Sequence, residues 1–127
     1  MAAGRYTFIV EQGATTDFEV EWKDKNGAAV DLAGYTGRMQ IRSDYGSGGT
    51  LYANLTSTTG SDGTGLSLYG SGGALPLASG SIGIYISAAS SSAFTFDEAV
   101  YDLELIKGTK VTRLLSGKVK LSKEVTV

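Results

Sequence analysis

Short runs in which apolar and polar residues alternate, separated by glycine-rich gaps, dominate this sequence. In the clearest run, Phe18, Val20 and Trp22 alternate with three carboxylates, and the runs at 38–42 and 100–106 repeat the pattern. An alternation of period two places every apolar side chain on the same face of an extended strand. We therefore expect the chain to build half-buried β-strands.

The number and spacing of these runs predict the fold class. About eight or nine short strands can be counted, whereas only the serine-rich stretch 87–93 favours a helical turn. Turn-forming residues separate the strands, as at 24–27 and 107–109. Many short strands with regularly spaced turns are typical of a sandwich or barrel. We expect one domain over residues 1–127, an all-β antiparallel sandwich with almost no helix and with mobile glycine-rich loops within 46–73.

The register of the alternation also predicts the core. Trp22 is expected to be buried between the two sheets, where its removal would cost about 3–5 kcal/mol. Its expected neighbours share the inward face of the alternating runs: Phe18, Met39, Ile41, Ile84, Leu103 and Leu105. Gly117, in the middle of the last extended stretch, predicts a β-bulge.

The residue types that this chain lacks argue against catalysis. It contains no cysteine and no histidine, which removes thiolate nucleophiles, the commonest general base near neutral pH and the usual zinc ligands. We therefore expect no enzyme, no metal centre and no cofactor. The net charge of −2 gives no electrostatic reason to bind nucleic acid or an anionic membrane. Residues 1–4 lack the basic start of a secretory signal, and no apolar run approaches the roughly 20 residues of a membrane span.

Several acidic residues admit a catalytic or metal-binding interpretation, which the sequence pattern disfavours. Glu19 and Glu21, with Asp17 two residues earlier, could serve glycoside hydrolysis, but their strict alternation makes a solvated strand face the better interpretation. The loop 24–27 resembles the opening of a calcium loop but has no glutamate at the twelfth position, so a turn is expected. Asp62 also lies in a turn, where a weak surface calcium site stays open as an alternative.

The glycine-rich segments 46–50 and 70–73 resemble phosphate-binding loops only superficially. Neither precedes a Lys-Ser or Lys-Thr pair, and neither opens a helix, so flexible loops are expected. With no catalytic role foreseen for the carboxylates, amide replacements are expected to change the stability by no more than about 0.5 kcal/mol. This expectation covers Glu19, Glu21, Asp62 and Asp102.

Two groups of residues are candidates for contact with a partner. Tyrosine offers contact area at low entropic cost, and three tyrosines lie in or beside the glycine-rich loops: Tyr45, Tyr52 and Tyr69. The alternative is that they pack over the ends of the sandwich. The second group comprises the first strand, which is apolar on both faces, and the extended stretch 122–127; its members are Tyr6, Phe8, Val10, Val125 and Val127. Segments 5–10, 46–50, 60–73 and 122–127 are expected to become ordered only on assembly.

Two sets of motifs carry a resemblance to a known family. The first comprises Glu11 to Thr15, Trp22 to Asp24 and Asp31 to Arg42; the second comprises Ser87 to Ala89, Val100 to Leu105, Val111 to Val119 and Glu124 to Thr126. Together they resemble a widespread group of small tailed-bacteriophage virion proteins, which are similar to the immunoglobulin-like N-terminal domain of phage baseplate upper proteins. The resemblance covers nearly the whole chain except its glycine-rich middle, which is longer here and resembles cyanophage proteins.

The resemblance implies an immunoglobulin-like sandwich and a structural place in a virion, in the tail, baseplate or neck, after assembly in the host cytoplasm. The implied partners are other virion proteins and copies of the same chain in a symmetric assembly. No catalytic residue carries over, because the shared motifs are a strand-turn-strand element at 31–36 and a hairpin at 101–119. The alternative is a receptor- or carbohydrate-binding module that holds a cell-surface glycan through its tyrosine-bearing loops.

Overall fold

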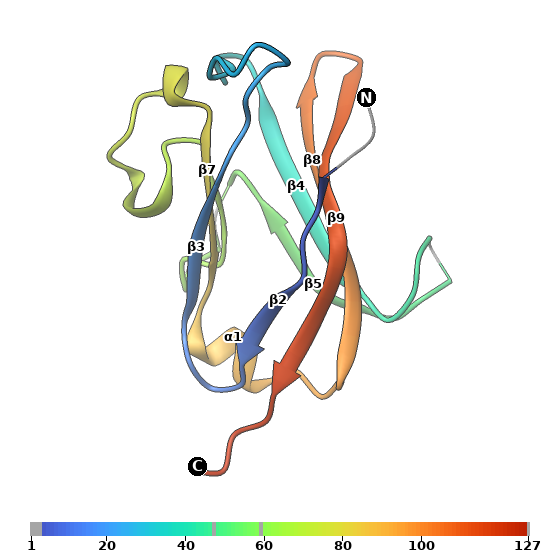
Figure 1. Cartoon of the computed structure of the whole chain (residues 1–127). Helices are drawn as coiled ribbons and strands as arrows, with labels where there is room; N and C mark the ends of the chain where they lie inside the picture. Colours follow the sequence, from blue (N-terminus) through green and yellow to red (C-terminus); the bar gives the residue numbers. More distant parts are fainter. Residues whose placement is uncertain (1–3, 47, 59, 127) are drawn as a thin grey trace.

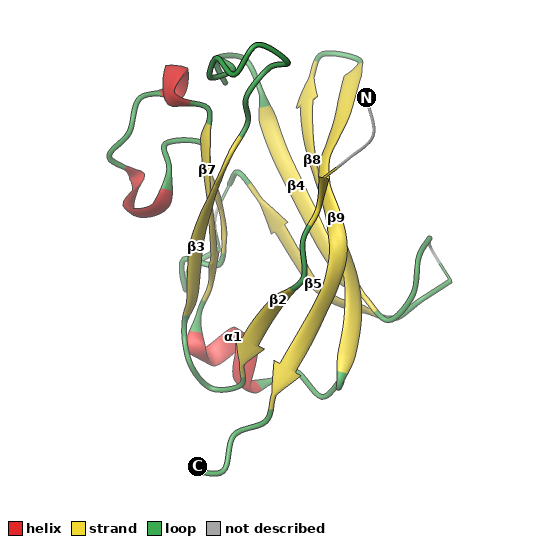
Figure 2. Ribbon diagram, viewed as in Figure 1, coloured by secondary structure: helices red, strands yellow, loops and turns green. Residues whose placement is uncertain are grey.

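Two β-sheets face each other in the computed structural model, which describes residues 4–46, 48–58 and 60–126 (Figure 1). The strands, in chain order, are β1 (Gly4–Arg5), β2 (Phe8–Glu11), β3 (Thr16–Glu21), β4 (Thr36–Arg42), β5 (Leu51–Thr56), β6 (Gly65–Ser67), β7 (Ser81–Ile86), β8 (Glu98–Lys107) and β9 (Lys110–Ser122). The helical elements are α1 (Ala88–Ser92) and two 3-10 turns, η1 (Ser71–Gly73) and η2 (Leu77–Ser79) (Figure 2). Strands make up 49% of the chain and helical turns 9%, which confirms the all-β prediction.

The strand order agrees with the immunoglobulin-like prediction. The larger sheet has the order β1-β9-β8-β4-β5, with β2 also paired to β9, and the smaller sheet has the order β3-β7-β6. In the immunoglobulin fold, a sheet that contains the second, fifth and fourth strands packs on a sheet that contains the third, sixth and seventh. The trios β3-β7-β6 and β4-β8-β9 follow that arrangement when β2 is taken as the first strand and β5, which pairs with β4 at the edge of the larger sheet, is left out of the count as an additional strand.

The larger sheet is mixed, which corrects the prediction of a wholly antiparallel sandwich. The strands β1 and β2 both pair in parallel with β9, and the register of β2 runs from Phe8 opposite Val119 to Glu11 opposite Ser122. A tight turn between neighbouring strands imposes an antiparallel pair. Almost the whole domain separates β2 from β9, so no turn sets their relative direction, and the alternation pattern does not reveal it.

The core lies between the sheets and is formed by the inward residues of each strand. Met39 lies opposite Leu103 and Ile41 lies opposite Tyr101, so β4 and β8 present one continuous apolar surface. The apolar residues of the described chain with no exposed surface are Val10, Leu32, Met39, Ile41, Leu55, Ile82, Ile84, Ile86, Leu103, Leu105 and Val119. These residues confirm the predicted inward faces of 38–42, 82–86 and 100–106.

Trp22 does not occupy the centre of this core, contrary to the sequence prediction. It follows β3 at one end of the sandwich and is only partly buried, as is Phe18. The Trp22 ring meets the Tyr35 ring edge to face, with 5.3 Å between centroids. Because β3 is an edge strand, its inward face is covered from one side only. The alternation therefore predicts the correct face for Trp22 but not its depth.

The predicted turns and the predicted helical turn are confirmed. One Asp24 carboxylate oxygen accepts the backbone N–H groups of Asn26 (2.8 Å) and Ala28 (3.0 Å), which closes the turn at 24–27. The side chain of Ser87 accepts the backbone N–H of Ser90 at 3.0 Å and so caps the start of α1. Among the described residues, no helix is long and apolar enough to cross a membrane.

The bulge in β9 falls at Leu114 instead of Gly117. Consecutive β8 residues pair with Leu115 and Arg113, so the ladder skips Leu114. At Gly117 the ladder is regular, but the segment between β1 and β2 passes directly over it, and a Cβ atom there would overlap the carbonyl oxygen of Tyr6. Glycine at 117 therefore permits a close backbone approach, which, like a bulge, is a common reason for a glycine inside a strand.

Candidate functional site

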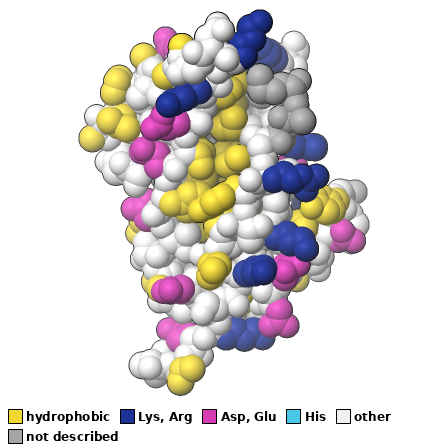
Figure 3. Space-filling view, in the orientation of Figure 1, with side chains coloured by type: hydrophobic (Ala, Val, Ile, Leu, Met, Phe, Trp, Pro, Cys, Tyr) yellow, Lys and Arg dark blue, Asp and Glu magenta, His cyan; other side chains and the backbone are white. Residues whose placement is uncertain are grey.

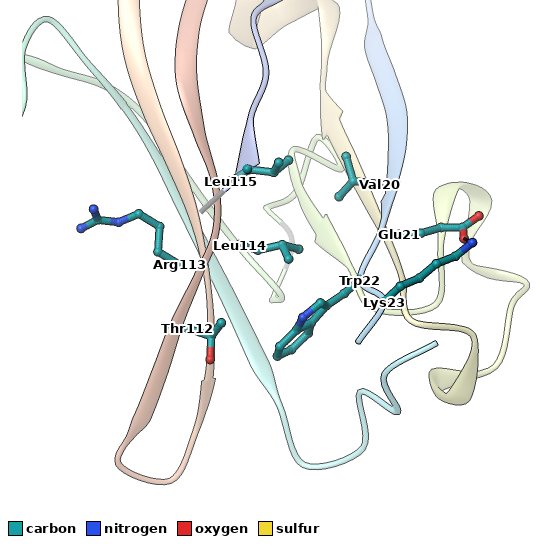
Figure 4. Close-up of a pocket in the computed structure, with 9 residues that line it drawn as sticks. Val20, Glu21, Trp22, Lys23, Thr112, Arg113, Leu114 and Leu115 are labelled. Carbon is teal, nitrogen blue, oxygen red and sulfur yellow. Dashed lines mark ion pairs between the residues drawn. The ribbon is translucent and has the colours of Figure 1, made fainter. Parts of the chain in front are cut away.

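An apolar groove of about 430 Å³ opens between the two sheets, where β3 and β9 face each other (Figure 4). Val20 and Trp22 line it from the β3 side, and Leu114 and Leu115 line it from β9. Figure 4 shows these four side chains pointing toward one another, whereas Arg113 points away. The groove therefore has an apolar floor and lies between β3 of the smaller sheet and β9 of the larger sheet.

The bulge explains how β9 supplies two neighbouring leucines to this floor. In a regular strand, consecutive side chains point to opposite faces, so only one of Leu114 and Leu115 would face the groove. The extra residue at Leu114 breaks that alternation, and both leucines pack against the core while staying partly exposed. Bulges often re-aim a side chain in this way at functional surfaces.

A second hollow, of about 360 Å³, continues along the same side between β2 and β3. Tyr6, Phe8 and Phe18 form an aromatic cluster here, with ring centroids 5.0 to 6.5 Å apart. Ile9 lines the rim and is 62% exposed. In Figure 3, the apolar side chains form one stripe that runs down this side of the molecule. We call the following residues the apolar stripe: Tyr6, Ile9, Phe18, Val20, Trp22, Leu114 and Leu115.

The backbone of Tyr6 is fixed against the larger sheet in the middle of the stripe. Its N–H donates to the Ser116 carbonyl at 3.1 Å, and its carbonyl accepts the Tyr101 hydroxyl at 2.7 Å. Burial, with a smaller effect of the neighbouring Tyr6, raises the pKa of Tyr101 to about 12, so this hydroxyl stays a donor at neutral pH. The stripe is thus held rigidly where β1 passes into β2.

The residues predicted for contact on the first strand and at 122–127 divide between surface and core. Tyr6 is 47% exposed, but Phe8 and Val10 are buried in the core and do not reach the surface. The exposed apolar side chain on β2 is Ile9, because β2 is covered on one face only. Val125 is 94% exposed, and Val127 lies outside the described residues.

Two of the segments expected to need a partner are anchored within the chain. The strand β2 pairs with β9, as described above, and the stretch after β9 is tied down as far as Glu124. The Lys123 ammonium lies 2.9 Å from an Asp97 carboxylate oxygen, and the Glu124 N–H donates to the Gln12 side chain at 3.0 Å. Only from Val125 onward do the described residues of this stretch stand away from the domain.

The three tyrosines of the glycine-rich region do not form a common platform. Tyr45 is 63% exposed in the loop between β4 and β5, whereas Tyr69 is 52% exposed after β6, and these loops lie on opposite sides of the sandwich (Figure 1). Tyr52 packs on Phe96 with 4.7 Å between ring centroids, as the alternative interpretation expects. Tyr69 lines a separate hollow of about 430 Å³, together with Tyr35.

The carboxylates on β3 do more than face solvent. Asp17 accepts the Ser71 hydroxyl at 2.8 Å, and Glu19 accepts the Ser71 backbone N–H at 2.8 Å. They therefore hold the glycine-rich turn η1 against the outer face of the smaller sheet. In the ranges that the structure describes, no three acidic side chains gather in a way that could bind a metal ion.

Asp62 is the most strongly hydrogen-bonded acid of the described chain. Its two oxygens accept the hydroxyls of Ser87 (2.5 Å) and Ser90 (2.7 Å) and the backbone N–H of Thr64 (3.0 Å). The hydrogen bond from Ser87, followed by those from Ser90 and Thr64, holds the pKa of Asp62 far below its usual range. Asp62 thus fastens the loop between β5 and β6 to the start of α1.

These bonds change the expectation for Asp62→Asn. The pKa of Asp62 is lower in the folded than in the unfolded chain, so its contribution to stability is complete above the unfolded value of about 4. That contribution is lost as the pH falls from there toward the folded value. We expect Asp62→Asn to lower the melting temperature at neutral pH and the gap to wild type to narrow below about pH 4. Thermal melts followed by circular dichroism check this, with Asp44→Asn as the control. A difference in melting temperature that does not change with pH would contradict the prediction.

Comparisons with known proteins add no relative to this picture: no protein-family model matches the chain, and no curated protein matches it. The candidate site therefore rests on the groove and the apolar stripe themselves. The sequence singled out Tyr6 at this site but missed Trp22, Leu114 and Leu115 as surface residues. The run of two leucines after Arg113 was the available signal, because it interrupts the alternation of the last strand.

Proposed function

We propose that this protein is a non-enzymatic structural component of a bacteriophage virion, in the tail, baseplate or neck, that acts through repeated protein–protein interfaces. The apolar stripe is the observation that carries the proposal. Contiguous exposed apolar surface on a small domain marks an interaction site, and here it runs between two strands. The motif resemblance to small virion proteins supplies the setting.

The strand edges beside the stripe support a protein as the partner. The smaller sheet ends at β3, and β1 covers β9 only at Leu115 and Ser116, so the edge of β9 at 110–114 has no strand beside it among the described residues. Exposed edges present backbone donors and acceptors that a neighbouring chain satisfies. A groove bordered by two such edges suits a protein surface better than a small molecule.

Hydrogen exchange tests this proposal at the level of single segments. In the isolated protein, we expect faster amide exchange at 18–22 and 110–114 than in the central strands β7 and β8, because these segments border the open groove. In purified particles, the same two segments should become protected, whereas the exposed loop 43–46 serves as an internal comparison. Absence of the protein from purified particles would contradict the proposed function directly.

A receptor- or carbohydrate-binding module is the second candidate, and one observation favours it. The hollow beside Tyr69 and Tyr35 has the size of a small-ligand site and carries the hydroxyls of Ser57 and Ser67 at its rim. A glycan array separates the two functions: saturable binding that Tyr69→Ala abolishes would support this candidate. The same array gives no signal if the protein acts only through the groove.

A further inference from the structure

Charged residues flank the apolar stripe with opposite signs on its two sides. Acidic side chains gather over β3 and basic ones over β1 and β9, with the stripe between them (Figure 3). We call the exposed carboxylates of β3 the acidic rail: Asp17, Glu19 and Glu21. We call four of the exposed cations of β1 and β9 the basic rail: Arg5, Arg113, Lys118 and Lys120.

This arrangement is self-complementary under one symmetry operation. A second copy turned by a two-fold axis that runs along the groove would place its basic rail on the acidic rail of the first copy, and its stripe on the first copy's stripe. A two-fold axis across the groove would instead place acid on acid and base on base, which is destabilising for directly opposed charges. Glu21 and Arg113 stand on opposite sides of the groove at the same level along it, so the first operation brings them together between copies (Figure 4).

The ion pairs within one chain leave the rails able to face a partner. Lys23 lies 3.4 Å from Glu21, Arg113 lies 3.5 Å from Asp102, and every side chain of these two pairs is at least 39% exposed. Lys118 lies 3.2 Å from Glu98, and both of these side chains are at least 47% exposed. Ion pairs at such exposure are worth little on their own. Ser71 donates to Asp17 and Glu19, and both of these side chains stay exposed.

A stable contact on the groove side would use a limited share of the molecular surface. A specific interface buries roughly 800 Å² on each partner. The whole accessible surface is 7111 Å², so such an interface needs about one ninth of it. Contact along the stripe would cover Tyr6, Ile9 and Trp22 together with the free edge of β3.

We propose that a second copy of this chain docks on the groove, stripe against stripe, about a two-fold axis parallel to β3 and β9. This inference rests on the proposed function, because it names the partner of the same site. The contact is isologous, so each Glu21–Arg113 pair occurs twice in the dimer. It closes on itself and thereby makes the dimer the unit that enters any larger assembly.

Charge reversal provides the test. Glu21→Lys turns both rails basic at the level of the groove, and Arg113→Glu turns both rails acidic there. In either homodimer, two attractive contacts become repulsive, and we expect self-association to weaken at least about tenfold. In an equimolar mixture, opposite rails meet again, so a heterodimer should form with an affinity close to that of the wild type. Sedimentation equilibrium over a concentration series measures all three states.

The controls carry the same charge changes outside the groove. Asp44→Lys matches Glu21→Lys, and Lys25→Glu matches Arg113→Glu; both positions are exposed in loops, and both variants should dimerise like the wild type. Ile9→Glu adds a negative charge at a 62% exposed side chain of the stripe, where folding does not depend on it, and should also give a monomer. A wild type that stays monomeric at all concentrations, or a mixture that fails to recover, overturns the inference.

The outcomes for the inference and for the proposed function are separable. A protein that is found in purified particles but never dimerises overturns only the two-fold contact. A protein that dimerises as described but is absent from particles overturns only the place in a virion.

Discussion

Replacing Leu103 with alanine is expected to lower the free energy of unfolding by about 2–5 kcal/mol. Leu103 has no exposed surface and lies in the middle of β8, opposite Met39 on one side and Leu115 on the other. Truncation removes its burial and leaves a cavity that two neighbouring strands cannot close. Urea denaturation measures the change, and an unaltered m-value would show that the unfolded state is the same.

Trp22→Ala is the informative companion to this variant. A tryptophan at the centre of a core would cost as much as Leu103 or more, whereas the partly buried Trp22 loses mainly its contact with Tyr35 and the groove floor. We therefore expect Trp22→Ala to be the milder of the two substitutions. If Trp22→Ala cost more stability than Leu103→Ala, Trp22 would have to be a core residue, and the description of the groove floor would be wrong.

Gly117→Ala is expected to cost at least about 1–3 kcal/mol, which is the usual penalty for an added methyl group in a filled site. The new Cβ atom would overlap the Tyr6 carbonyl oxygen, so the segment between β1 and β2 must move away from β9. That movement also breaks the hydrogen bond from the Tyr101 hydroxyl. Gly48→Ala is the matched control, because nothing lies within 4 Å of a Cβ atom there.

Tyr101→Phe separates the loss of the Tyr101 hydrogen bond from the steric overlap that Gly117→Ala introduces. It removes only the hydroxyl donor, and we expect a loss of about 1 kcal/mol, the typical net value of one hydrogen bond. If Gly117→Ala lowered the stability no more than Gly48→Ala does, the β1–β2 segment would have room to shift. The close approach of that segment to Gly117 would then not contribute to stability. Differential scanning calorimetry of the four proteins, wild type included, gives the comparison.

Local patterns explain why much of the fold was predictable from the sequence. The inward faces of Met39, Ile41, Leu103 and Leu105 follow from the alternation of their own strands. The turn at 24–27 follows from Asp24 and the glycine at its end. Each of these features depends on residues close together in the chain, where steric and hydrogen-bonding rules act directly.

The groove was not predictable because it depends on contacts between distant segments. Its two walls, 20–23 and 112–115, are about ninety residues apart in the sequence. No pattern within either segment shows that the two lie together in the fold. Gly117 was predicted to mark a bulge, since a glycine in a strand marks either a bulge or a close approach, and only the position of Tyr6 decides between them. Phe8 and Val10 are predicted from the sequence to contact a partner molecule, but they are buried within the domain, because the strand that covers them lies at the other end of the sequence.

The parallel pairing of β2 with β9 has a mechanical consequence. The two strands lie side by side but come from opposite ends of the described chain, so the chain runs into β1 from one end of the sandwich and runs out of β9 at the other (Figure 1). A force that pulls these ends apart acts along the strands, and the hydrogen bonds of the ladder at Phe8 to Glu11 carry it together in shear. If a hairpin such as β8–β9 were pulled open at its free ends, its hydrogen bonds would instead break one after another. Resistance to such a force is set by the unfolding barrier and not by equilibrium stability, so this domain should bear tension best along the line that joins its two ends.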